Sequence, residues 1–207
     1  MGKTAAVVLF TFSAAQAETV TIAALGDSLT QGYGLLRDDG FVPQLESWLL
    51  EQGEEVVLIN AGVSGDTTAG GKSRAAWTMT PDVDALILAL GGNDVLRGLP
   101  AAAARDNLAA ILDVARQQDL PVLLVGITAP GNFGAEYKSA FQAIYADLAA
   151  EYDTLLYDSF LQALQTPGTN TAAFVQDDGL HPNPEGVKRI VRDMGPSVRQ
   201  LIANTAH

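Results

Sequence analysis

The chain has 207 residues, 48% of them hydrophobic and 17% charged, a composition typical of a globular domain with a proper core rather than of a disordered chain. With 12 Lys and Arg against 24 Asp and Glu, its formal net charge is −12, which argues against nucleic acid and anionic lipid surfaces as partners. The absence of cysteine excludes disulfides and a lipid attached to an N-terminal cysteine.

Residues 1–17 have the pattern of a secretory signal peptide. Lys3 precedes an apolar run over residues 5–15, and Ala15-Gln16-Ala17 has the small-x-small pattern that signal peptidase reads. A retained membrane anchor and a plain cytosolic start are the alternatives, but the run is shorter than the roughly 20 residues that span a bilayer. We therefore expect cleavage after Ala17, a periplasmic or secreted location, no stable membrane anchor, and a monomer with one domain over residues 18–207.

The rest of the chain alternates short apolar segments with amphipathic ones. The pattern predicts strands over residues 20–25, 55–60, 84–90, 121–127 and 154–157. It predicts helices over residues 41–52, 101–118, 136–152 and 160–165, and a last helix from Pro184. Strands apolar on both faces, alternating with helices, indicate an α/β fold with a parallel five-stranded sheet covered on both sides. In such folds ligands bind beyond the carboxyl ends of the strands, where the glycine-containing loops of this chain lie.

The first strand ends in Gly26-Asp27-Ser28-Leu29, which places a hydroxyl at the mouth of the sheet. Asp27 and Ser28 are both good helix N-cap residues, so this segment could also be an ordinary turn between a strand and a helix. The common nucleophile elbow of α/β-hydrolases, Gly-x-Ser-x-Gly, is absent because residue 30 is threonine. Ser28 is therefore a candidate nucleophile of a different class.

The chain has two histidines, His181 and the terminal His207, so a histidine general base in the body of the chain must be His181. Asp178 precedes it by three residues, close enough in a tight turn to hold Nδ1–H and leave Nε2 free to accept a proton from a serine. The alternative is a helix entry with an acidic turn. A metal site is not expected, because without cysteine or another internal histidine only carboxylates could complete it.

Acyl transfer also needs donors for an oxyanion. The backbone N–H groups of Ser28 and Gly62 and the side-chain amide of Asn93 follow three different predicted strands, so they could converge on one point. Taken singly, Gly62 and Asn93 could equally be turn formers.

In chain order these segments resemble the blocks that define the SGNH (GDSL) hydrolases, namely Gly26-Asp27-Ser28-Leu29, Gly62, Gly92-Asn93-Asp94 and Asp178-x-x-His181. Longer stretches resemble the periplasmic TesA-like subgroup, whose members are called thioesterase I, lysophospholipase L1 or arylesterase: residues 60–67, 90–98 and 177–183. The resemblance covers essentially the whole of residues 18–207.

The resemblance implies a flavodoxin-like, three-layer α/β/α sandwich and a serine esterase without cofactor. By the family's motif Ser28 would be the nucleophile, His181 the base and Asp178 its orienting acid, while Gly62 and Asn93 would join the Ser28 amide as oxyanion donors. The substrate would be a small-molecule ester or lipid. Export favours lysophospholipids, fatty-acyl esters or aryl esters over acyl-coenzyme A, with thioester cleavage as a further capacity.

Leu96, Leu99 and Phe133 are predicted to lie in loops that border Ser28, and such apolar side chains suit an acyl or aryl group better than a sugar. Ordinary loop packing is the alternative for these residues, and a carbohydrate O-deacetylase is the alternative activity. Residues 65–73 also come close to a phosphate-binding P-loop. Five residues rather than four separate Gly65 from Gly71, and the anionic Asp66 would face the phosphate, so nucleotide binding is disfavoured.

Overall fold

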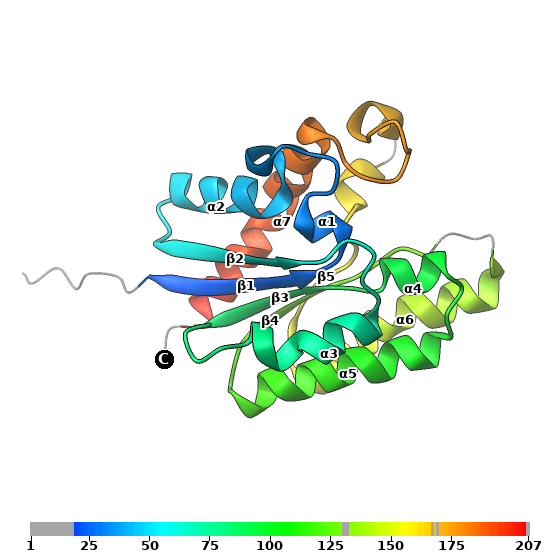
Figure 1. The fold of residues 1–207 in the computed structure, drawn as a ribbon, viewed down its shortest axis with the longest axis horizontal. Coiled ribbons are helices and arrows are strands. Elements are labelled where there is room, and N and C mark those ends of the chain that lie inside the picture. Colours follow the sequence, from blue (N-terminus) through cyan, green and yellow to red (C-terminus); the bar gives the residue numbers. More distant parts are fainter. Residues whose placement is uncertain (1–18, 130–132, 167, 169, 206–207) are drawn as a thin grey trace, which may run out of the picture.

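The computed structural model describes residues 19–129, 133–166, 168 and 170–205. Its centre is a five-stranded, all-parallel sheet with the strand order β2-β1-β3-β4-β5 (Figure 1). The strands are β1 (Val20–Gly26), β2 (Val56–Gly62), β3 (Ala85–Ala89), β4 (Val122–Val125) and β5 (Leu155–Tyr157). This is the flavodoxin-like order, in which the order of strand addition reverses between β1 and β3 and a crevice opens at their carboxyl ends. The predicted parallel sheet is confirmed.

Each face of the sheet is covered by helices, as Figure 1 shows. In β1 the side chains of Ile22 and Ala24 join one apolar cluster and those of Ala23 and Leu25 join the other, because successive strand residues point to opposite faces. The helices on the first face are α2 (Phe41–Glu51) and α7 (Pro184–Ala203), and those on the second face are α3 (Thr68–Thr78), α5 (Ala101–Gln117) and α6 (Ala135–Tyr152). The result is the expected α/β/α sandwich with a core on each side of the sheet.

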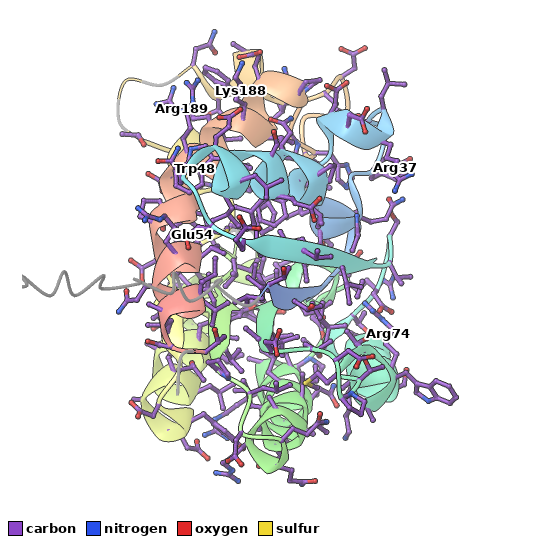
Figure 2. The ribbon with its side chains drawn as sticks, turned by 90° about the vertical axis from the view of Figure 1, so that its left-hand side faces the viewer. Arg37, Trp48, Glu54, Arg74, Lys188 and Arg189 are labelled. Carbon is purple, nitrogen blue, oxygen red and sulfur yellow. The ribbon has the colours of Figure 1, made fainter. Side chains whose placement is uncertain are left out.

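Helices α2 and α7 pack closely on the first face, and Figure 2 shows Trp48 and Glu54 beside α7. A Cβ at Gly195 of α7 would lie 2.4 Å from the Trp48 indole, so only glycine allows this approach. The Arg199 guanidinium of α7 also contacts the Glu54 carboxylate at 2.6 Å. Helix α7 begins as predicted, with Pro184 in its first turn and Asn183 as its N-cap.

The predicted strands and long helices all exist and end within two residues of their expected bounds. The predicted helix over residues 160–165 is shorter, a single 3₁₀ turn, η3, at Gln162–Leu164. Two further 3₁₀ turns, η1 (Arg37–Asp39) and η4 (Thr171–Phe174), and three helices were not predicted: α1 (Ser28–Gln31), α3 and α4 (Gly92–Leu96).

Helix α3 contains Gly70 and Gly71, which lower its intrinsic propensity and make the segment resemble a loop. Packing explains both glycines. A Cβ at Gly71 would lie 2.1 Å from the Leu90 side chain, and one at Gly70 would lie 1.9 Å from an oxygen of Asp66. The glycines therefore let α3 approach the sheet, and this tertiary contact outweighs their local preference.

The predicted signal peptide over residues 1–17 lies outside the described residues. Within the described part of the chain, none of the helices has the length and apolar character needed to cross a membrane.

Candidate active site

Helix α1 follows β1 directly and places Ser28 at the carboxyl edge of the sheet (Figure 1). Asp27 is its N-cap, and one carboxylate oxygen accepts a hydrogen bond of 3.0 Å from the Leu29 N–H. Gly32 ends the helix in the left-handed conformation with φ of 86°. The N-cap interpretation of this segment is thus correct for Asp27, and the cap fixes Ser28 in the first turn, beside the crevice between β1 and β3.

The side chains of Ser28, His181 and Asp178 form one hydrogen-bonded chain. Ser28 Oγ lies 2.8 Å from His181 Nε2, and His181 Nδ1 lies 2.7 Å from Asp178 Oδ2. The imidazole is largely buried, with 14% of its surface exposed. Such an arrangement can accept the serine proton at Nε2 while the carboxylate holds the ring and stabilises the imidazolium.

A short turn holds Asp178 and His181 in this geometry. An isolated antiparallel bridge between Val175 and Pro182 closes it, and Asp178 Oδ1 accepts hydrogen bonds from the N–H groups of Leu180 and His181. The backbone hydrogen bond from His181 lowers the pKa of Asp178 to about 2, with further contributions from the His181 side chain and the Leu180 N–H. Asp178 therefore remains a carboxylate throughout the ordinary pH range.

The predicted oxyanion donors follow strands β1, β2 and β3. Gly62 pairs in register with Gly26, and a Cβ at Gly62 would lie 2.3 Å from Gln31 N, so glycine is required for β2 to pass α1. The Gly62 N–H donates to Asn60 Oδ1 at 3.0 Å and would have to leave or share this acceptor to reach an oxyanion. Asn93 lies in α4, and its Nδ2 donates to Asp27 Oδ2 at 3.3 Å.

A cavity of about 280 Å³ opens beside Ser28 and His181. Asn93 also lines it, which leaves Ser28, Asn93 and His181 facing the same space. The rest of the wall is mainly apolar, and its apolar residues come from five parts of the chain: Leu29, Val95, Leu96, Ile127, Phe160, Leu161, Leu164, Val175 and Leu180. An apolar cavity with a few polar groups at one end is typical of a small-molecule site.

Comparison with known proteins identifies the family of this site. Residues 24–189, most of the chain, match the model of the GDSL-like lipase/acylhydrolase family. The chain belongs to this family. Membership makes it an acyl hydrolase, and it agrees with the resemblance drawn from the four sequence blocks.

Individual relatives of this GDSL-like hydrolase are esterases and thioesterases by name. Esterase TesA of Pseudomonas aeruginosa is 35% identical over 188 residues, which cover 90% of this chain and 92% of the relative. Thioesterase 1/protease 1/lysophospholipase L1 of Escherichia coli K12 is 34% identical over 197 residues, covering 94% and 90%. The crystal structure of AlinE4, an SGNH-hydrolase family esterase, is 40% identical and covers 90% of this chain and 98% of AlinE4, with a TM-score of 0.74.

Among the three residues predicted to border the nucleophile, Leu96 lies in the cavity wall, whereas Leu99 and Phe133 are not among the described residues that line it. The Phe133 ring packs 5.4 Å from the Tyr137 ring, centroid to centroid, and the Tyr137 hydroxyl donates to the Leu99 carbonyl at 2.8 Å. These two residues therefore join the end of α4 to the start of α6. The residues that line the far wall, such as Leu161 and Leu164, were not predicted as site residues, although the apolar spacing around η3 was visible in the sequence.

Two neighbours of the His181 turn, Tyr33 and Gln176, were not predicted from the sequence. The Tyr33 ring lies 4.7 Å from the imidazole, centroid to centroid. The Gln176 amide donates to the carbonyls of Tyr33 and Pro182 at 2.8 and 3.0 Å, which ties the glycine-rich segment after α1 to the turn. Neither residue carries a local sequence signal, because the contact joins segments more than 140 residues apart.

Asp27 is a buried acid at the centre of the site, with 3% of its surface exposed. Burial disfavours the charged form and raises its pKa to about 6, although the hydrogen bond from Leu29, the charge of His181 and the hydrogen bond from Asn93 oppose the shift. Between pH values of about 4 and 6 the folded protein therefore keeps a proton that the unfolded chain has released. The free energy of unfolding therefore falls as pH rises through this window, and above it the ionisation of Asp27 causes no further decrease.

We expect Asp27→Asn to lower the activity, and to be more stable relative to the wild type at neutral pH than at acid pH. The variant cannot ionise, so its unfolding free energy relative to the wild type should rise by about 2–3 kcal/mol between pH 4 and pH 7.5. The amide has one acceptor oxygen where the carboxylate has two, so it cannot accept from both Leu29 and Asn93 in the present geometry, and kcat should fall. Urea denaturation at both pH values checks the stability, with Asp82→Asn as a control for the lost charge on an exposed carboxyl. If the unfolding free energy of the variant relative to the wild type were the same at both pH values, the raised pKa of Asp27 would be contradicted.

The described residues contain no group of three or more His, Asp or Glu side chains placed to hold a metal ion. The segment that resembles a P-loop is also engaged otherwise. The Asp66 carboxylate pairs with Arg74 at 2.7 Å, and the Gly70 N–H donates to the Thr67 hydroxyl, its N-cap, at 3.4 Å. This segment is the start of α3 and packs against the sheet.

Proposed function

We propose that this GDSL-like hydrolase is a serine esterase that cleaves acyl and aryl carboxylic esters, and also thioesters and lysophospholipids, through an acyl-enzyme on Ser28. The observation that carries the proposal is the hydrogen-bonded chain from Ser28 Oγ through His181 to Asp178 at the end of an apolar cavity. Relatives named esterase, arylesterase and thioesterase/lysophospholipase support the choice of substrate class.

Acylation begins when His181 Nε2 takes the Ser28 proton and Oγ attacks the ester carbonyl carbon. The carbonyl oxygen becomes an oxyanion, for which the N–H of Ser28 and the amide of Asn93 are the donors at the cavity and the N–H of Gly62 is the donor from the end of β2. The imidazolium, paired with Asp178, then gives its proton to the leaving oxygen. The alcohol, phenol or thiol departs and the acyl group stays on Ser28.

Deacylation repeats the same steps with water as the nucleophile. His181 takes a proton from water, the hydroxide attacks the acyl-enzyme, and the second oxyanion forms in the same place. Collapse of this intermediate breaks the bond to Ser28 Oγ, which regains its proton from His181. The products are the carboxylic acid and free enzyme, and each step balances without a cofactor.

The cavity wall favours an acyl or aryl group over a sugar. Besides Leu96, it contains Ile127, Leu161 and Leu164, which offer no hydrogen bonds to the hydroxyl groups of a carbohydrate. Four other lining residues have side chains that can form such bonds, but most of the wall's surface is apolar: Thr128, Ser159, Gln165 and Thr171. At about 280 Å³ the cavity lies at the small end of the range for ligand sites, which suits a single acyl chain or aromatic ring. This apolar wall argues against a carbohydrate O-deacetylase.

We also propose a cellular location and an oligomeric state for the enzyme. The leader pattern of residues 1–17 supports removal of this segment after Ala17 and a periplasmic or secreted enzyme with one domain over residues 18–207. We propose that this enzyme acts as a monomer, because Ser28, His181 and Asp178 all come from a single chain.

The test is hydrolysis of p-nitrophenyl esters from acetyl to palmitoyl by residues 18–207, with no added metal. We expect the highest kcat/KM on a chain longer than acetyl, because each buried methylene adds about 0.8 kcal/mol of apolar transfer free energy until the cavity is full. Ser28→Ala should remove the activity, and a phosphonate ester should label Ser28 in the wild type. Activity confined to acetyl esters would favour the deacetylase, and full activity in Ser28→Ala would show that Ser28 is not the nucleophile.

A further inference from the structure

Arg74 is a largely buried cation that the proposed mechanism does not use. It lies on α3, a helix that contributes none of the proposed catalytic groups, and Figure 2 shows it beside the edge of the sheet formed by β2. Its side chain is 23% exposed. All three of its nitrogen positions are engaged, with Nε donating to Asp66 at 2.7 Å, Nη1 to the Ala61 carbonyl at 2.6 Å and Nη2 to the Gly26 carbonyl at 2.8 Å.

The two carbonyls belong to the strand ends that precede the proposed oxyanion donors. Gly26 ends β1 and comes two residues before Ser28, and Ala61 comes directly before Gly62 at the end of β2. The Gly26 carbonyl also accepts the Val63 N–H at 3.1 Å. The planar guanidinium thus joins the ends of two neighbouring strands at a fixed spacing, because Nη1 and Nη2 are held rigidly in one plane.

The contact with Ala61 acts on the Gly62 N–H directly, because both groups belong to the same peptide unit. That unit is planar and trans, so its C=O and N–H point in opposite directions, and fixing one fixes the other. A charge-assisted hydrogen bond to the carbonyl also polarises the peptide and strengthens the N–H as a donor. Arg74 therefore fixes the direction of the Gly62 N–H, which donates to Asn60 Oδ1 in this structure, without touching a substrate.

Helix α3 also contacts the segment that carries Asn93, the third proposed donor. The Asp94 carboxylate, 2% exposed, accepts hydrogen bonds from the Thr68 N–H at 2.8 Å and the Thr68 hydroxyl at 2.6 Å. Asp94 is the neighbour of Asn93 in α4. Helix α3 thus binds all three segments that carry a proposed donor, and Arg74 accounts for two of them.

We propose that Arg74 is a positioning residue for the oxyanion site, which sets the direction and donor strength of the Gly62 peptide and the spacing between the ends of β1 and β2. This inference rests on the proposed esterase function. It predicts that losing the guanidinium weakens stabilisation of the oxyanion in the transition state more than it weakens substrate binding.

The experiment measures kcat and KM of Arg74→Met and Arg74→Lys on p-nitrophenyl butyrate. We expect Arg74→Met to lower kcat by about 10- to 100-fold, less than the full loss of an oxyanion donor, with KM changed by less than about threefold. Millimolar methylguanidinium should restore part of the lost kcat, because it can fill the space and bind the two carbonyls. Arg105→Met is the matched control, since Arg105 forms an exposed ion pair with Glu151 between α5 and α6.

Arg74→Lys keeps the test valid if Arg74→Met fails to fold. Lysine can keep the ion pair with Asp66 that holds α3, but one nitrogen cannot take the three positions of Nε, Nη1 and Nη2. Its kcat should therefore still fall, while circular dichroism and Tm stay close to the wild type. Wild-type kcat in folded Arg74→Lys or Arg74→Met would overturn the inference, as would a loss confined to KM. If wild-type enzyme hydrolyses no ester, the proposed function fails instead, and Ser28→Ala separates the two cases.

Discussion

His181→Ala should lower kcat for ester hydrolysis by about 10⁵- to 10⁶-fold, because it removes the group that takes and returns the proton in both half-reactions. Among the described residues His181 is the histidine at the site, where its Nε2 lies 2.8 Å from Ser28 Oγ. The fold should survive, because Asp178 Oδ1 still binds the backbone N–H groups of Leu180 and residue 181.

The measurement compares kcat on p-nitrophenyl butyrate for the wild type, His181→Ala and the control His207→Ala. After subtraction of the reaction that imidazole catalyses without enzyme, added imidazole should raise the rate of His181→Ala, because it can enter the cavity and stand where the side chain stood. It should not raise the corrected rate of Ser28→Ala. Circular dichroism and urea denaturation show whether the variant is folded. A folded His181→Ala within about tenfold of the wild-type rate would mean that another group is the base.

The order of the elements could be read from the sequence because it depends on local pattern. Strand β3 is an uninterrupted apolar run with every residue buried, and α7 starts at an asparagine cap followed by proline. The elements that were missed depend on distant contacts. The glycines of α3 favour a loop locally, and the close approach of Gly71 to Leu90, a residue distant in the sequence, explains why glycine lies in this helix.

In the candidate site, too, residues in local motifs could be predicted, whereas residues that depend on distant contacts could not. Ser28, Asp178 and His181 were predictable because each lies in a short motif, and Asp178 and His181 share one turn closed by the bridge from Val175 to Pro182. Arg74 was not predictable, since its three acceptors lie 8 to 48 residues away and no local pattern marks it. Residues that act on a substrate tend to sit in recognisable loops, whereas residues that hold those loops are spread along the scaffold.

The loops at the carboxyl edge are held by charged side chains that form ion pairs or hydrogen bonds. Arg74 pairs with Asp66, and the buried Asp94 is bound by both polar groups of Thr68. Asp27 is buried beside the nucleophile and has a pKa of about 6, because desolvation outweighs the hydrogen bonds from Leu29 and Asn93 and the charge of His181. Its stability cost is of the kind expected where a structure is arranged for function rather than for stability.

Asn93→Ala should lower kcat about 100- to 1,000-fold with little change in KM, the effect of losing one oxyanion donor. The structure adds a second consequence. Asn93 Nδ2 also donates to Asp27 Oδ2, so its loss leaves a buried carboxylate oxygen without this donor and should raise the pKa of Asp27 further. The unfolding free energy of the variant, relative to the wild type, should therefore be lower at pH 7.5 than at pH 4.

The link between the two side chains can be tested with a double-mutant cycle on kcat. If Asp27 acts by orienting the Asn93 amide, then Asp27→Asn should cost much less in the Asn93→Ala background than in the wild type, because the group that it orients is already gone. Asn204→Ala, at the C-terminal end of α7, is the matched control for removing an asparagine. Additive losses would mean that Asp27 acts on Ser28 independently, and a loss below about tenfold in Asn93→Ala would remove Asn93 from the oxyanion site.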